Sequence, residues 1–195
     1  MSSAKILVFA GSIRTGSHNA RLAALAAKLL TLAEAEVTRI SLQDYPLPLY
    51  DADLEARAGP PEHAVNLKRL MMRHGGVLIA TAEYNASVTP LLKNTIDWIS
   101  RVRDGAEPPL AAYRNRVFAL AAASPGTLGG YRALMAVRQV LELGCGASVL
   151  PGEVAVRDAA NAFDEEDNLR DPRIAEAFNA LLRRLVDAAR YRTMS

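Results

Sequence analysis

Short apolar segments alternate with longer helical stretches along the whole chain, and this alternation constrains the fold more than any other feature. Continuous apolar runs of this kind are typical of strands that are buried on both faces of a parallel sheet. The strands are predicted at residues 6–10, 36–42, 77–80, 116–123 and 147–150. Helical periodicity predicts helices at residues 18–32, 62–74, 90–101, 130–143 and 173–191.

Strands that alternate with helices pair in parallel through right-handed crossovers. Five strands of this length favour an α/β, flavodoxin-like three-layer sandwich with a parallel sheet in the order 2-1-3-4-5. A ligand would then bind at the carboxyl ends of strands 1, 3 and 4. The segment 44–61 contains four prolines and is predicted to be a long surface loop within a single domain that spans residues 1–195.

Composition excludes several classes of protein. The net charge is +2 and no basic block is present, so nucleic acid is not expected as a partner. One cysteine and three scattered histidines offer neither a disulfide nor a metal cluster, and the single cysteine favours the reducing cytoplasm. The N-terminus lacks the apolar core of a signal peptide, and no apolar stretch is long enough to span a membrane.

The loop after the first strand is equipped to bind an anion. Gly11 permits a tight turn, Ser12 and Ser17 supply hydroxyls, and the free amides of the next helix point at this loop. Arg14 adds a positive charge whose forked geometry suits phosphate oxygens. The alternative is an ordinary strand-to-helix turn with Ser17 as the helix cap, but Arg14 and Asn19 are more polar equipment than capping needs.

The residues that this loop lacks narrow the choice of phosphate. Ser17 and His18 stand where a nucleoside triphosphatase needs lysine followed by serine or threonine. Ile13 stands where a dinucleotide fingerprint needs its middle glycine, and the loop has no cysteine nucleophile for a phosphatase. A terminal monophosphate, as on FMN, remains.

Two more loops at the same edge of the sheet suit a flat ring. Tyr84, in the loop after the third strand, offers an aromatic face, and the amides of that turn offer donors. Three glycines in the loop 124–130 would let the backbone approach a ligand closely. We expect Glu83 to be a solvated carboxylate, Trp98 to pack in the core or at a subunit interface, and Cys145 to be a small buried residue.

The chain resembles the NADPH-dependent FMN reductase family, and three motifs carry the resemblance. They are Gly11-Ser12-x-Arg14-x-x-Ser17-x-Asn19, Glu83-Tyr84-Asn85-x-Ser87 with Leu92-Lys93-Asn94-x-Ile96-Asp97-Trp98, and Leu49-Tyr50-Asp51-x-Asp53. The resemblance implies FMN bound by Ser12, Arg14, Ser17, Asn19, Ala82, Glu83, Tyr84, Asn85, Ser124 and Gly126. Ala82 and Ala123 depart from the family, which usually has proline and often has serine at these positions.

The same resemblance implies an enzyme that passes electrons from NADPH or NADH through non-covalent FMN to a small-molecule acceptor, such as a quinone, a flavin, an azo compound or chromate. It also implies a homodimer or homotetramer. Tyr84 and Arg101 are candidates for the acceptor site, Tyr84 as a border of the exposed ring face and Arg101 as an attractor of anions. The rival hypothesis is a flavodoxin-type electron carrier without a substrate of its own, although such carriers are usually acidic and this chain has a pI of about 8.8.

Overall fold

A computed structural model describes residues 3–103 and 105–192. Met1 and Ser2, at the N-terminus that we compared with a signal peptide, lie outside the described residues. The strands are β1 (Lys5–Ala10), β2 (Glu36–Ile40), β3 (Gly76–Thr81), β4 (Glu83–Tyr84), β5 (Ser87–Val88), β6 (Val117–Ala123), β7 (Ser148–Val149) and β8 (Val154–Val156). The main helices are α1 (His18–Leu32), α2 (Ala52–Ala58), α3 (Glu62–Met72), α4 (Pro90–Arg101), α5 (Ala111–Arg114), α6 (Tyr131–Gln139) and α7 (Pro172–Arg192).

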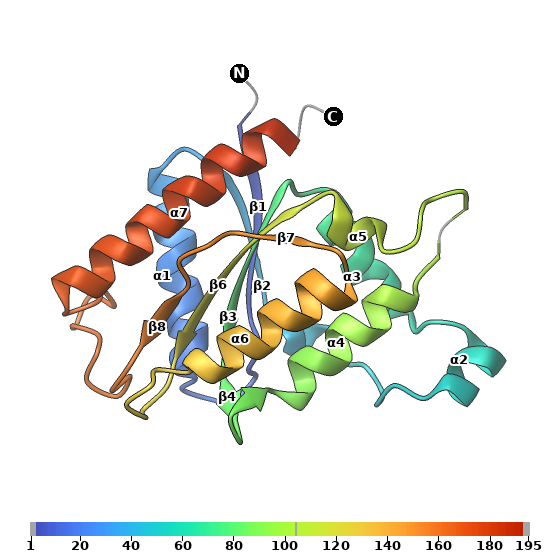
Figure 1. The fold of residues 1–195 in the computed structure, drawn as a ribbon, viewed down its shortest axis with the longest axis horizontal. Helices are drawn as coiled ribbons and strands as arrows, with labels where there is room; N and C mark the ends of the chain where they lie inside the picture. Colours follow the sequence, from blue (N-terminus) through green and yellow to red (C-terminus); the bar gives the residue numbers. More distant parts are fainter. Residues whose placement is uncertain (1–2, 104, 193–195) are drawn as a thin grey trace.

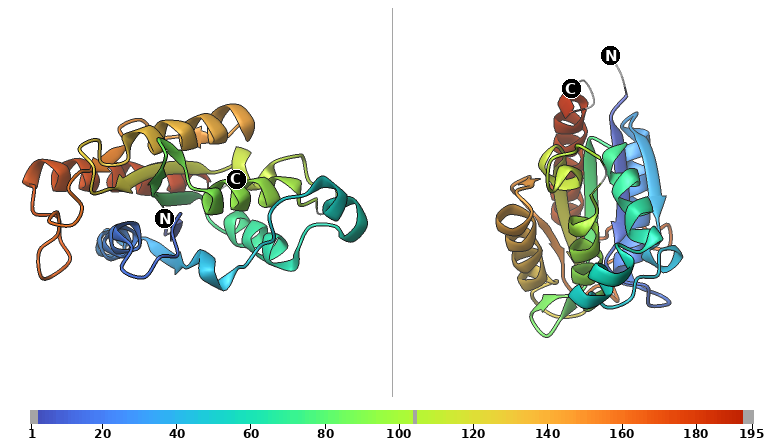
Figure 2. Two further views of the ribbon diagram at one scale, coloured as in Figure 1. Left: turned by 90° about the horizontal axis from the view of Figure 1, so that it is seen from below. Right: turned by 90° about the vertical axis from the view of Figure 1, so that its right-hand side faces the viewer.

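The predicted parallel sheet is confirmed. Its order is β2-β1-β3-β6, and β7 and β8 both pair in parallel with β6. The helices α1 and α7 cover one face of the sheet, and α3, α4 and α6 cover the other (Figure 1). The start of β1 and the end of α7 lie at one end of the molecule, and the β4–β5 hairpin lies at the opposite end (Figures 1 and 2).

The fifth strand position is split in two, whereas the sequence predicted one strand at 147–150. The short strand β7 pairs with the beginning of β6, and β8 pairs with its end. Pro151 and Gly152 separate the two strands; Gly152 has φ 78°, and proline cannot donate a ladder hydrogen bond. The later strand, β8, was missed because three residues between two loops give no periodicity.

The segment 44–61 contains a helix where we predicted only a surface loop. The carboxylate of Asp51 accepts hydrogen bonds from the amides of Asp53 (2.7 Å) and Leu54 (3.2 Å) and so caps α2, which ends at Ala58 with Gly59 as its C-cap. All four prolines lie outside α2. The predicted helix at 130–143 also differs, because α6 ends at Gln139 and one π-helical turn, η2 (Val140–Gly144), follows it.

Two of the family-like motifs contact each other. The Asn94 side chain on α4 accepts from the Tyr50 amide (2.8 Å) and donates to the Pro48 carbonyl (2.9 Å). The Trp98 indole also donates to the Pro48 carbonyl (2.7 Å) and packs edge-on against the Tyr50 ring. Trp98 is fully buried within the chain, so of the two predicted alternatives, the core and a subunit interface, it belongs to the core. The motif that includes Tyr50 and Asp51 therefore anchors the segment before α3 on α4.

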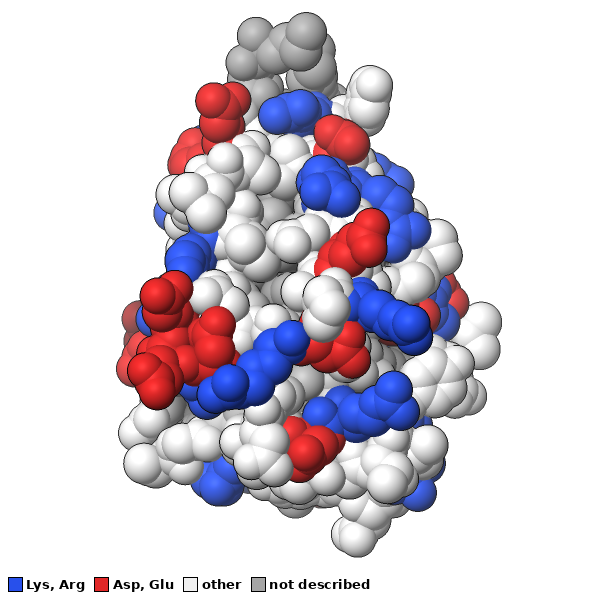
Figure 3. Space-filling model, turned by 90° about the vertical axis from the view of Figure 1, so that its left-hand side faces the viewer, with Lys and Arg blue, Asp and Glu red and all other residues white. Residues whose placement is uncertain are grey.

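The surface carries mixed charge. On the face shown in Figure 3, basic and acidic side chains are interspersed. No helix among the described residues combines the length and apolarity needed to cross a bilayer.

Candidate functional site

A cleft of about 350 Å³ lies where the loops after β1, β3 and β6 meet. In the strand order, β2 lies next to β1 on one side and β3 lies next to it on the other. The connections that leave β1 and β3 therefore run in opposite directions, and the gap between their loops, at the carboxyl ends of the strands, is where open α/β sheets bind ligands. The cleft brings together eight residues predicted from the sequence: Ser12, Arg14, Ser17, Asn19, Ala82, Glu83, Tyr84 and Ser124.

Three lining residues were not among the predicted binding residues. They are His18, Ala123 and Pro125, each a direct neighbour of a predicted residue. Asn85 and Gly126, which we predicted, do not line this cleft. The backbone at Gly126 is nevertheless open, because a Cβ atom built there would have no neighbour closer than the Ser124 hydroxyl at 3.8 Å.

One end of the cleft is suited to an anion. The Ser17 hydroxyl caps α1 by accepting from the Ala20 amide (3.3 Å), which leaves its own proton free for donation. The Arg14 guanidinium donates to the Gly16 carbonyl (3.2 Å), and no carboxylate within the described ranges 3–103 and 105–192 pairs with it. Its charge is therefore available to a ligand at the α1 N-terminus.

His18 does not add a second charge to this end. Burial, together with the positive charges of Arg14 and Arg21, lowers the pKa of the His18 imidazole below its usual range. His18 is thus neutral near pH 7. Among the described residues that line the cleft, Arg14 therefore supplies the positive charge.

The side chain of Asn19 holds the cleft together. Its amide nitrogen donates to the Ala123 carbonyl (2.9 Å), and its oxygen accepts from the Ala123 amide (2.8 Å). Asn19 is only 3% exposed. Both the oxygen and one N–H of the side-chain amide are therefore bonded to the end of β6, so Asn19 joins the start of α1 to the third loop of the cleft.

Tyr84 lines the cleft from the β4–β5 hairpin. It pairs with Ser87 across a two-residue turn, and the residue is 52% exposed. An exposed aromatic ring beside a cleft gives a flat apolar wall for a planar ligand.

The side chain of Glu83 is largely shielded from solvent, although we expected a solvated carboxylate. Its carboxylate accepts hydrogen bonds from the Arg132 guanidinium (2.9 Å from Nε) and from the Ala133 amide (3.3 Å). The expectation was wrong because β4 turns this side chain toward the start of α6. A basic residue in the first turn of α6 opposes the helix dipole and was the one signal in the sequence for a nearby carboxylate.

Two of the three glycines after β6 serve the fold and do not approach a ligand. A Cβ atom on Gly129 would lie 2.8 Å from the Arg157 amide nitrogen, and one on Gly130 would lie 2.8 Å from the Cβ of Ala122. Both residues have positive φ values, 61° and 89°. Only Gly126 leaves open space beside the cleft.

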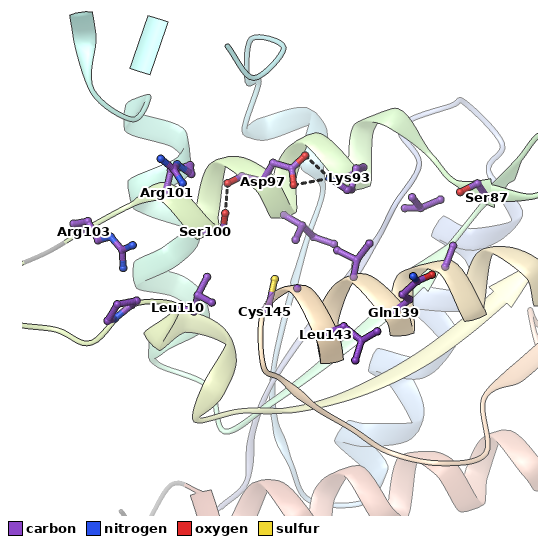
Figure 4. A pocket seen from close by; sticks show the side chains of 16 residues that line it. Ser87, Lys93, Asp97, Ser100, Arg101, Arg103, Leu110, Gln139, Leu143 and Cys145 are labelled. Carbon is purple, nitrogen blue, oxygen red and sulfur yellow. Dashed lines mark hydrogen bonds and ion pairs between the residues drawn. The ribbon is translucent and has the colours of Figure 1, made fainter. Parts of the chain in front are cut away.

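Arg101 lies in a different depression, the α4–α6 groove, which has a volume of about 820 Å³ and also includes Lys93, Asp97 and Cys145 (Figure 4). Its guanidinium is paired with the Glu55 carboxylate at 2.9 and 3.1 Å. Because this partner offsets its charge, the structure gives no support to Arg101 as an attractor of anions.

Cys145 is buried in the same groove, as predicted. Burial raises the pKa of its thiol to about 11, so the sulfur stays protonated and unreactive near neutral pH. No group of three potential metal ligands occurs among residues 3–103 and 105–192.

Comparison with known proteins agrees with this geometry. The model of the family described as NADPH-dependent FMN reductase matches residues 4–161. An NAD(P)H-dependent FMN reductase of Pseudomonas aeruginosa is 34% identical over 183 residues, covering 93% of this chain and 92% of that protein. A quinone reductase of Escherichia coli K12 is 37% identical over 138 residues, covering 70% of this chain and 69% of that protein.

A solved structure extends the similarity to nearly the whole fold. The flavoenzyme NAD(P)H:(acceptor) oxidoreductase FerB of Paracoccus denitrificans matches with a TM-score of 0.77 and 27% identity, covering 97% of this chain and 98% of that one. The family match and the two relatives cover well over half of the chain. The chain therefore belongs to the NADPH-dependent FMN reductase family, whose members are oxidoreductases that use FMN with NAD(P)H as the electron donor.

Proposed function

We propose that the cleft holds FMN with its phosphate beside Arg14 and Ser17 and its ring beside Ala82 and Tyr84, and that a quinone is the electron acceptor. One observation carries this proposal: the lining of a single cleft combines an uncompensated cation beside a helix N-terminus with a half-exposed aromatic residue. These two features match the two chemically different ends of FMN. The relative named quinone reductase favours a quinone over a flavin, an azo compound or chromate.

When bound, FMN supplies hydride acceptance from NAD(P)H and electron transfer to the second substrate. The protein binds FMN and orients it in the cleft. Arg14 and the free proton of Ser17 bind and orient the phosphate, and Ser12 adds a further hydroxyl. Because Tyr84 is half-exposed, the nicotinamide and the acceptor can occupy the same face of the flavin ring in turn. No step requires a protein base, and the Glu83 carboxylate is already engaged.

The proposal also covers the domain organisation, the cellular compartment and the oligomeric state of the protein. We infer one domain over residues 1–195 in the reducing cytoplasm, as the single cysteine suggests. The half-exposed Leu128, within the third loop of the cleft, and Tyr131, directly after it, are the side chains that a second copy in a homodimer or homotetramer would cover. Light scattering of the purified protein measures this state, and a monomer at working concentration would refute the oligomer.

Successive use of one ring face predicts ping-pong kinetics. Double-reciprocal plots of initial rate against NADPH, at several fixed concentrations of a benzoquinone, should give parallel lines. Lines that intersect would show that both substrates bind together and would contradict the shared face of the flavin ring.

Free FMN, an azo dye and chromate, assayed at matched concentrations, should give lower kcat/KM values than the quinone. A higher value for any of them would overturn the choice of acceptor.

A further inference from the structure

The helix α6 begins without a cap of its own. Its N-cap residue, Gly130, has no side chain, and no acidic residue lies in the first turn. Amides in a first helical turn have no partner within the helix and are normally satisfied by a capping side chain. The first turn instead contains Arg132, whose charge is unfavourable next to the positive end of the helix dipole.

The side chain of Glu83, which comes from a different loop, takes the place of the missing cap. One carboxylate oxygen accepts from the Ala133 amide (3.3 Å), the third residue of α6, as a capping residue would. The other oxygen accepts from the Arg132 guanidinium. The Glu83 side chain is 8% exposed, against 54% for Arg132. Burial opposes ionisation, but these hydrogen bonds outweigh it and hold the pKa of the Glu83 carboxyl below its usual range.

The hairpin that carries Glu83 needs outside support. Its strands, β4 and β5, have two residues each, and isolated hairpins of any length are marginally stable in water. The turn places Asn85 and Ala86 at φ 49° and 64°, a conformation that an alanine adopts only at a cost. The side chain of Tyr84 borders the cleft from this same hairpin.

We propose that Glu83 is a positioning residue that fastens the Tyr84 hairpin to the start of α6 and thereby fixes the two walls of the cleft against each other. Tyr84 lines the cleft from the hairpin, and Ser124 and Pro125 line it from the loop that leads into α6. The Glu83 carboxylate connects the hairpin to α6 through bonds to protein groups, the Arg132 guanidinium and the Ala133 amide. This inference rests on the proposed placement of the flavin ring in the cleft.

The test measures flavin affinity at a temperature well below unfolding, where loss of global stability leaves the dissociation constant unchanged. For Glu83→Ala we expect the dissociation constants of FMN and riboflavin to rise by the same factor, about tenfold. Arg14→Ala should weaken FMN and leave riboflavin unaffected, because riboflavin lacks the phosphate. Glu83→Gln keeps an oxygen for the Ala133 amide and should recover most of the ring affinity. Glu62→Ala, at an exposed position in α3, is the matched control.

Hydrogen exchange measures directly the bond between the Ala133 amide and the Glu83 carboxylate. Protection of the Ala133 amide should fall in Glu83→Ala and persist in Glu83→Gln. The inference is overturned if Glu83→Ala binds both flavins as the parent protein does, or if Glu83→Gln is as weak as Glu83→Ala. Should Glu83→Ala fail to fold, the milder Glu83→Asp, which shortens the reach of the carboxylate toward the Ala133 amide, must raise both dissociation constants, and unchanged constants would overturn the inference. Failure of the proposed function looks different, because Arg14→Ala would then leave FMN affinity unaltered.

Discussion

Replacing Asn19 with alanine should lower the free energy of unfolding by about 2–6 kcal/mol, because it leaves two buried backbone groups without partners. These are the amide and the carbonyl of Ala123, which now bond to the Asn19 side chain at 2.8 and 2.9 Å. Each unsatisfied group costs roughly 1–3 kcal/mol. The same bonds set the start of α1 against the end of β6, so FMN affinity should fall as well.

Urea denaturation, followed by the fluorescence of the buried Trp98, measures the effect. Asn161→Ala is the matched control, because within the described residues the side-chain amide of Asn161 bonds to the exposed Asp158 carboxylate. The free energy of unfolding of this variant should change by less than about 0.5 kcal/mol. An Asn19→Ala variant within that same margin would show that Asn19 does not support this junction.

Gly129→Ala is expected to cost about 2–5 kcal/mol of stability. Two effects combine: a left-handed alanine costs roughly 1–2 kcal/mol, and overpacking costs roughly 1–3 kcal/mol. Gly129 has φ 61°, and a Cβ atom there would lie 2.8 to 2.9 Å from backbone atoms of residues 155–157. These neighbours belong to the backbone of β8 and the residue after it, which cannot rotate away as a side chain would.

The control lies three residues earlier in the same loop. Gly126→Ala adds the same methyl group where the nearest neighbour is 3.8 Å away, and the φ of Gly126 is not in the left-handed region. We expect its stability to change by less than about 0.5 kcal/mol. Thermal unfolding of both variants decides the matter, and equal melting temperatures would contradict the account of Gly129.

Periodicity predicted the central sheet because its strands are long and apolar. The strands β1, β3 and β6 are each six or seven residues long and almost wholly buried. Continuous apolar runs of this length are typical of strands at the centre of a parallel sheet. The short elements gave no such signal. β8 has three residues, and each strand of the β4–β5 hairpin has two, so their pairing partners alone define them.

The residues of the cleft were largely predictable, but their roles were not. Loops after neighbouring parallel strands meet at one edge of the sheet, so Ser12, Tyr84 and Ser124 could be brought together from the sequence. Whether a polar side chain faces the ligand or the protein depends on contacts across the chain. Asn19 lies 104 residues from Ala123, and Glu83 lies 49 from Arg132, so neither engagement leaves a local pattern.

The central claim is that this cleft binds FMN for reduction by NAD(P)H. Its most direct measurement is a titration of the purified protein with FMN, followed by anaerobic addition of NADPH while the flavin absorption band is recorded. We expect saturation at one FMN per chain and loss of the band on addition of NADPH, with both effects weakened in Arg14→Ala. A protein that takes up no FMN, or that binds FMN equally well in Arg14→Ala, would contradict it.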